Sequence, residues 1–166
     1  VITRVRDHLE NFCFDKAALD SYSFFWDELC AFYVEIIKPV LFGKQGSKKE
    51  QVNKQKVLLV TLVAALRLMH PMIPFITEEI FQLLKTHFTG LTLLCNGNEY
   101  IQEAISALLS PACAVAPFPK SMSTNKEKDL QVEKDFKKIQ EVVYTIRNIR
   151  AEMGLGPNIT TELFIE

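Results

Sequence analysis

The amino-acid sequence predicts a mainly α-helical fold, an antiparallel helical bundle with a small α+β appendage at its C-terminal end. Long segments repeat apolar residues at steps of three and four, and the connections between them are short. Only at residues 160–165 does the pattern change to a strict alternation of polar and apolar residues. With 166 residues, of which 48% are apolar, the chain is long enough for one domain and a small appendage, and too apolar for intrinsic disorder.

The first helices are predicted at residues 1–10 and from Asp15 to Lys38, with Asp15 as the N-cap of the second helix. Pro39 is expected to end that helix. The apolar residues of the second helix predict one broad buried face, formed by Leu19, Tyr22, Phe25, Trp26, Leu29, Phe32, Tyr33 and Ile36.

A loop at residues 43–47 precedes a helix at 48–69, whose second half is apolar nearly all round and is therefore expected in the middle of the bundle. His70 is expected to cap it. A corner at residues 70–74 leads to a helix at 75–87, with Glu78 and Glu79 predicted in its first turn, where the helix dipole favours acids.

Residues 88–117 have a mixed character that suggests short strands beside a short helix. Residues 118–128 resemble an exposed linker. A long amphipathic helix follows at 129–152 and ends at Gly154, and the alternation at 160–165 suits a strand. We therefore expect a bundle at 1–117 and a linker, helix and strand at 118–166. A chain that starts inside a helix and stops in a strand is interpreted as a segment of a longer protein.

The charge distribution is uneven although the formal net charge is only −1, which argues against a dedicated, strongly basic nucleic-acid binder. Residues 14–35 carry five acids (15, 20, 27, 28 and 35) against Lys16, whereas residues 44–56 carry five lysines (44, 48, 49, 54 and 56) against Glu50. The lysines could steer a polyanion, or the two regions could be solvated helix faces.

The sequence contains no motif of catalysis, metal binding or membrane insertion. It lacks the glycine-rich phosphate-binding, zinc-protease and serine-hydrolase patterns, so no catalytic residue is proposed. Four scattered cysteines indicate reduced thiols in a cytoplasmic protein and no metal site. No long uncharged apolar run and no apolar signal region occurs, so no membrane association is expected.

Three segments carry a resemblance to a known family. Residues 22–35 (YSFFWDELCAFYVE) resemble the Y-x-F-F-W-x-E-F-C-D-W-Y-x-E stretch of valyl-tRNA synthetases, and residues 70–81 (HPMIPFITEEIF) resemble their H-P-F-M-P-F-I-T-E-E-I-W. Residues 146–153 (IRNIRAEM) match their I-R-N-I-R-A-E-M, which favours the valyl branch over the isoleucyl and leucyl enzymes. The departures are Phe32 and Phe81 where the family often has Trp, and Ala31 where it often has Asp.

The resemblance implies the helical anticodon-binding domain of a class Ia synthetase, with the start of its C-terminal extension. Its implied partners are the anticodon stem-loop of tRNA(Val) and the catalytic and editing domains of the same polypeptide. It implies no cofactor for this segment, ATP with Mg for the whole enzyme, and a cytoplasmic monomer. The alternatives are the anticodon domain of an isoleucyl or leucyl enzyme, and a helical protein-interaction domain that uses the apolar seam of residues 129–153.

The candidate RNA contacts are one aromatic residue and five cations, each with a structural alternative. Aromatic side chains can stack on unpaired bases, and Lys or Arg can bind phosphate. The alternatives are core packing for the aromatic cluster, solvated lysines, arginines that pair with acids of the bundle, and an internal ion pair for Arg67. The tRNA-binding candidates are Phe24, Lys44, Lys48, Lys49, Arg147 and Arg150.

Overall fold

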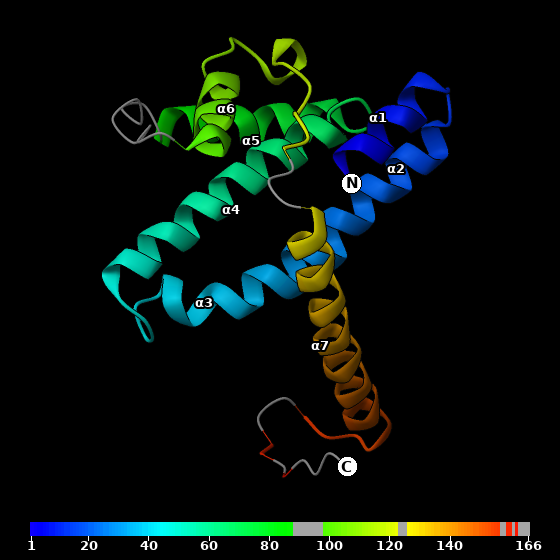
Figure 1. Ribbon diagram of the computed structural model, residues 1–166, viewed down its shortest axis with the longest axis vertical. Helices are drawn as coiled ribbons and strands as arrows, with labels where there is room; N and C mark the ends of the chain where they lie inside the picture. Colours follow the sequence, from blue (N-terminus) through cyan, green and yellow to red (C-terminus); the bar gives the residue numbers. More distant parts are fainter. Residues whose placement is uncertain (88–97, 123–125, 157–158, 161, 163–166) are drawn as a thin grey trace. The chain divides into compact units, whose positions relative to one another are not determined.

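A computed structural model describes residues 1–87, 98–122, 126–156, 159–160 and 162, and these residues are mainly helical (Figure 1). The chain divides into two compact units, Val1–Met122 and Ser123–Glu166. Among the described residues, no helix is both long enough and apolar enough to cross a membrane.

The first unit begins with α1 (Ile2–Glu10) and a long, unbroken helical rod. The rod comprises α2 (Phe14–Ser23), the π-helix η1 (Phe24–Val34) and α3 (Glu35–Leu41). Cys13 is the N-cap of α2, so Asp15 lies within the first turn and is not the cap. Pro39 lies inside α3 and does not end the helix. Its fixed φ suits a helix, and its carbonyl accepts hydrogen bonds from Lys44 and Gln45 at 2.8 and 3.1 Å, which close the last turn.

The predicted buried face of the rod is only partly correct. A π-helix closes i→i+5 hydrogen bonds, so within η1 residues spaced by three and four no longer stay on one side. Leu29 and Phe32 are buried as expected. However, the exposed fractions of Leu19, Tyr22 and Trp26 are 65%, 57% and 56%, so these three do not belong to the core.

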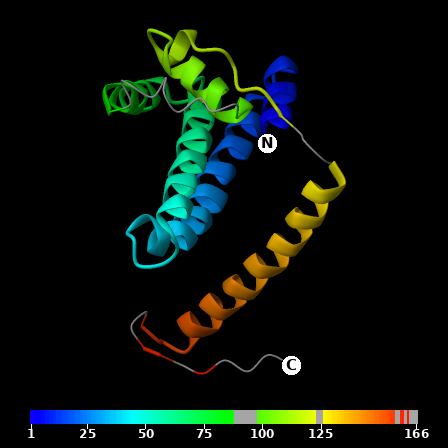
Figure 2. The same ribbon diagram turned by 60° about the vertical axis from the view of Figure 1, so that its left-hand side comes forward.

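Helix α4 (Lys48–Met69) returns beside the rod and is the centre of the first unit, as Figures 1 and 2 show. Ser47 caps its first turn. His70 is the backbone C-cap, but its side chain makes a contact of 2.8 Å between its Nδ1 and Thr77 Oγ1 and so does not cap α4. Helix α5 (Pro74–His87) starts one residue before the predicted start, which moves Glu78 and Glu79 out of its first turn.

The main core lies where α4 meets α5, α6 (Glu99–Leu108) and the 3-10 turn η3 (Cys113–Val115). A second cluster joins α1, α2 and α4 through Val5, Ala17 and Leu68. The main cluster consists of Leu59, Val63, Leu66, Phe81, Ala104, Ala107, Leu108 and Cys113. The apolar second half of α4 is therefore buried, as the sequence predicts.

The expected strands are not supported. The short helix expected between 88 and 117 is α6, whereas residues 112–117 form a 3-10 turn with irregular flanks. Residues 88–97 lie outside the described part of the chain. The C-terminal strand also lies mostly outside it, and Thr160 and Glu162, which are described, are not in a strand. No strand occurs within the described ranges, so the α+β appendage is not supported.

The second unit contains one long helix, α7 (Lys126–Glu152). Gly154 follows it with φ +64, a conformation that glycine adopts without strain, and so ends the helix as expected. The apolar seam of α7 is not buried, because Val132, Ile139 and Met153 have exposed fractions of 67%, 53% and 67%.

The units divide at Met122, and Pro119 is fully buried in the first unit, so the exposed linker does not begin at residue 118.

Candidate nucleic-acid interface

The lysine loop, residues 42–49, connects α3 with α4 and presents three of the predicted RNA contacts. Lys44, Lys48 and Lys49 are all exposed. Gly43 and Gly46 have φ of +68 and +76, so the loop needs residues that tolerate the left-handed region. The ammonium groups are therefore presented to solvent on a tight turn, as phosphate contacts require.

Two hydrogen-bond sets hold the lysine loop in place. Ser47 Oγ accepts from the backbone N–H of Glu50 at 3.2 Å, and the Glu50 carboxylate accepts from the Ser47 N–H at 2.6 Å. This capping box satisfies two backbone donors at the start of α4. The backbone hydrogen bond from Ser47, with a second bond from its hydroxyl, lowers the pKa of Glu50. Gln51 Nε2 donates to the carbonyl of Leu41 at 2.6 Å and ties α4 to the end of α3.

The predicted aromatic contact, Phe24, is half-buried at the start of the π-helix, and the most exposed rings are elsewhere. Phe12 is 79% exposed and has φ 57, and its ring meets Phe14 edge-on at 6.1 Å between centroids. Phe75 is 91% exposed at the start of α5. Neither ring was predicted from the sequence as an RNA contact. Their positions in a turn and directly after Pro74 are the signal that could have identified them.

The two ends of the rod carry different groups. Met72, three residues before Phe75, packs against the α1–α2–α4 cluster, so Phe75 and Phe12 lie toward the same end of the first unit. The lysine loop lies at the other end of the rod, beyond α3 (Figure 1). One end therefore offers the exposed rings of Phe12 and Phe75, and the lysine loop offers cations together with the exposed ring of Phe42.

The two arginines predicted on the last helix differ in their surroundings. Arg147 is exposed. Arg150 is half-buried, and its Nη2 donates to the carbonyls of Gly156 and Ile159, both at 2.8 Å. The Arg150 guanidinium is thus engaged by these two carbonyls, which makes Arg147 the better placed of the two to meet a phosphate.

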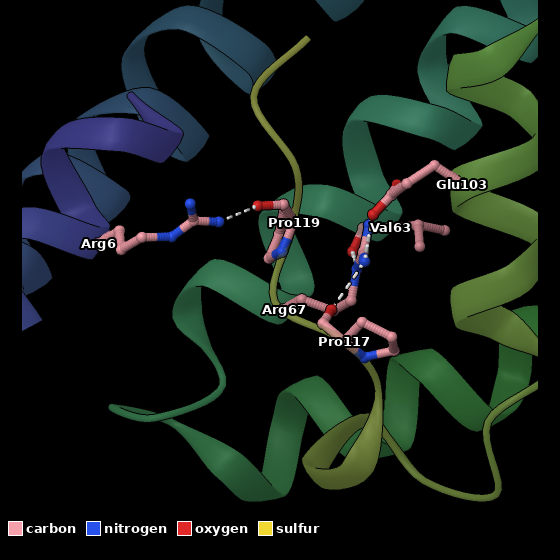
Figure 3. A network of polar contacts seen from close by, with 6 residues as sticks. All are labelled: Arg6, Val63, Arg67, Glu103, Pro117 and Pro119. Carbon is pink, nitrogen blue, oxygen red and sulfur yellow. Dashed lines mark hydrogen bonds and ion pairs between the residues drawn. The ribbon is translucent and has the colours of Figure 1, made fainter.

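Arg67 fixes the centre of the first unit, as Figure 3 shows. Its two terminal nitrogens bond the two carboxylate oxygens of Glu103 at 2.6 and 2.8 Å, and Nη1 also donates to the carbonyl of Pro117 at 2.9 Å. Its Nε donates to the Val63 carbonyl at 3.1 Å. The internal ion pair predicted for Arg67 is confirmed. The side chain joins α4, α6 and the segment at 117, so it is not available to RNA.

A second arginine contacts the segment at residues 117–119. Arg6 on α1 donates to the Pro119 carbonyl at 3.0 Å and its guanidinium lies 5.2 Å from the centroid of the Phe118 ring, a cation–π contact. Residues 117–119 are therefore held between α1 and α4 by two arginines (Figure 3).

The acids and thiols of the core show structural roles. Burial raises the pKa of Glu78, but hydrogen bonds from Gln82 and from the backbone N–H of Cys113 outweigh burial, so the pKa of Glu78 is lowered. Burial, with the nearby Glu78 charge, raises the pKa of Cys113 to about 11, so its thiol stays protonated. In the described part of the chain, no group of three or more His, Cys, Asp or Glu residues could hold a metal ion.

The chain matches the family of anticodon-binding domains of tRNA ligases over residues 1–165. It belongs to this family. A valine–tRNA ligase of Protochlamydia amoebophila is 49% identical to it over 164 residues, which cover 99% of this chain and 17% of that protein. Valine–tRNA ligases of Chlamydia pneumoniae and Chlamydia trachomatis are 39% and 41% identical over 165 and 158 residues. The chain therefore spans about a sixth of the length of these relatives, and its anticodon-binding family membership does not favour a helical protein-interaction domain.

Proposed function

We propose that this chain is the anticodon-binding region of a valine–tRNA ligase and that it binds tRNA(Val). The observation that carries the proposal is the 49% identity to a valine–tRNA ligase along 99% of the chain. Its place in the whole enzyme would be to hold the tRNA while other domains of the same polypeptide carry out ATP- and Mg-dependent aminoacylation. We expect that enzyme to be a cytoplasmic monomer.

The binding mode follows from the two ends of the rod. Exposed rings such as Phe12 and Phe75 suit stacking on unpaired anticodon bases, because every base has an aromatic face. The exposed lysines 44, 48 and 49 suit phosphates, which carry no base identity but position the RNA. A whole tRNA is a long molecule and can meet both ends of the first unit. Of the other candidates, Phe24 and Arg150 are the least accessible.

The test is binding of the 166-residue chain to a transcript of tRNA(Val), to the same transcript with a changed anticodon, and to an unrelated tRNA, at two salt concentrations. We expect a preference on the order of tenfold for the intact valine anticodon, and weaker binding at higher salt. Equal binding of all three transcripts contradicts anticodon reading by this chain.

Two sets of variants separate base contacts from phosphate contacts. Phe12→Ala with Phe75→Ala is expected to reduce the preference between anticodons, because it removes the stacking surfaces. The second set is a triple variant, Lys44→Gln with Lys48→Gln and Lys49→Gln. It is expected to weaken the binding of all three tRNAs alike and to reduce the salt dependence of that binding. The reverse pattern contradicts the assignment of the two ends.

A further inference from the structure

The rod formed by α2 and η1 carries an exposed apolar stripe that the RNA-binding account does not use. We call Leu19, Tyr22 and Trp26 the aromatic stripe, and their exposed fractions are 65%, 57% and 56%. Leu19 and Tyr22, three residues apart in α2, share one side of that helix, and the stacking of Tyr22 on Trp26 places the indole beside them. Side chains of this size at this exposure form a surface that a partner could cover.

The two rings of the aromatic stripe are already ordered. Tyr22 and Trp26 stack at 6.4 Å between centroids, with 9° between their planes. A stacked pair loses little side-chain freedom when a partner covers it, so this arrangement lowers the cost of binding.

The charges around the aromatic stripe select the partner. Residues 14–35 carry five acids against one lysine, and Asp15, Asp27 and Glu28 are exposed. Asp20 is paired with Arg4 at 3.2 Å and lies 3.5 Å from His8, so it faces α1. An anionic surface repels RNA phosphates and attracts lysine and arginine side chains. The stripe therefore suits a cationic polypeptide better than it suits the tRNA.

We propose that the aromatic stripe, with Asp15, Asp27 and Glu28 beside it, is a docking surface for a basic amphipathic α-helix of a partner protein. Such a helix buries apolar anchors spaced by three, four and seven residues, which matches the length and periodicity of the stripe. Its lysines and arginines meet the acids at the edge, and one cation can also lie over the open face of the indole. This inference does not depend on the tRNA that the chain binds.

Trp26 makes the surface directly measurable, because it is the single tryptophan of the chain. The probe is a 14-residue amphipathic helical peptide built of Leu and Lys, titrated into the 166-residue chain while the indole fluorescence is recorded. We expect a saturable blue shift and protection from acrylamide quenching. The same peptide with Glu in place of Lys is expected to produce neither effect.

Three variants locate the binding. Tyr22→Ala and the pair Asp27→Asn with Glu28→Gln are each expected to weaken peptide binding on the order of tenfold, the second with a reduced dependence on salt. The matched control is Tyr144→Ala, which removes a 68% exposed aromatic ring from α7 and is expected to change nothing. Circular dichroism of each variant establishes that it is folded.

Three results overturn the proposal. Blue-shifted, quencher-resistant emission of Trp26 in the free chain means that the stripe is already covered. Equal binding of the Lys and Glu peptides means that the acids do not select the partner. A single-stranded RNA oligonucleotide that shifts the Trp26 emission in the same way assigns the stripe to nucleic acid.

Discussion

The helices α4 and α7 have similar lengths, 22 and 27 residues, but different ways of being stabilised. In α4, every residue from Ala65 to Met69 is buried, and Leu66 and Leu68 pack against elements that are distant in sequence. In α7, none of the side chains described from 129 to 152 is buried. Within α7, Gln131 Nε2 donates to the carboxylate of Asp135, one turn further on, at 3.1 Å. A long helical pattern in a sequence therefore predicts the helix but not what stabilises it.

The difference extends to the cationic side chains of the two helices. Arg67 in α4 is 4% exposed and is fully engaged by Glu103 and two backbone carbonyls, whereas Arg147 in α7 is exposed. A buried arginine fixes the packing of helices, and an exposed one can bind a ligand.

The largest expected effect is that of Arg67→Ala. Removing the guanidinium leaves the Glu103 carboxylate and the Pro117 carbonyl without their partner, which costs about 3–5 kcal/mol of unfolding free energy. Urea unfolding followed by circular dichroism measures it. The double variant Arg67→Met with Glu103→Leu is expected to recover most of the loss, because no buried charge remains. A loss below about 1 kcal/mol for Arg67→Ala is incompatible with this role.

The next largest effect on the unfolding free energy is expected when one apolar residue of each helix is truncated. Leu66→Ala removes a fully buried side chain of the α4 core and is expected to cost about 3 kcal/mol. Ile139→Ala in α7, where the side chain is 53% exposed, is expected to cost less than about 0.5 kcal/mol. The same unfolding measurement serves both variants. Similar losses at the two sites contradict the proposed difference between the helices.

A smaller effect is expected at the start of α4. Ser47→Ala removes the N-cap acceptor for the Glu50 N–H and is expected to cost about 1 kcal/mol. Because the cap also shapes the lysine loop, the variant should weaken tRNA binding as well. The control is Thr61→Ala, because the native Thr61 hydroxyl donates to the carbonyl of Val57 within α4 at 2.8 Å. Equal effects of the two changes on tRNA binding contradict a role for the cap in presenting the lysines.

The smallest expected effect depends on pH. The pKa of Glu50 is lowered in the folded chain, so its charged form stabilises the fold above the ordinary carboxyl pKa, and this contribution is lost as the pH falls through the folded value. Glu50→Gln should therefore be less stable than the parent chain at neutral pH and equal to it in acid. Thermal unfolding at a series of pH values measures the difference. A difference that grows in acid contradicts this sign.

The sequence predicted the helices of the first unit well because each depends on local periodicity. This periodicity predicted the bounds of α4 and the burial of its second half. The position of Arg67 beside the apolar face also predicted its internal pairing. The π-helix could not be predicted, because no apolar spacing distinguishes η1 from an α-helix, and the exposure of Trp26 within η1 was therefore missed. Pro39 was also misinterpreted, because its fixed φ suits a helix and α3 continues beyond it to Leu41.

The candidate site was only partly predictable. A run of lysines beside glycines indicated an exposed loop, and the loop presents all three lysines. Whether Arg150 or Arg147 is accessible depends on the carbonyls of Gly156 and Ile159, which no helical pattern reveals. The exposure of Phe12 and Phe75 similarly depends on how the corners of the bundle pack.

The central claim is that the chain meets tRNA through the first unit, and lysine footprinting tests it most directly. The chain is acetylated with and without tRNA(Val), and each lysine is quantified by mass spectrometry. We predict that Lys44, Lys48 and Lys49 lose reactivity when the tRNA binds, whereas the exposed Lys134, Lys137 and Lys138 of α7 serve as the comparison and change less. Protection of the α7 lysines with unchanged reactivity in the lysine loop contradicts the claim.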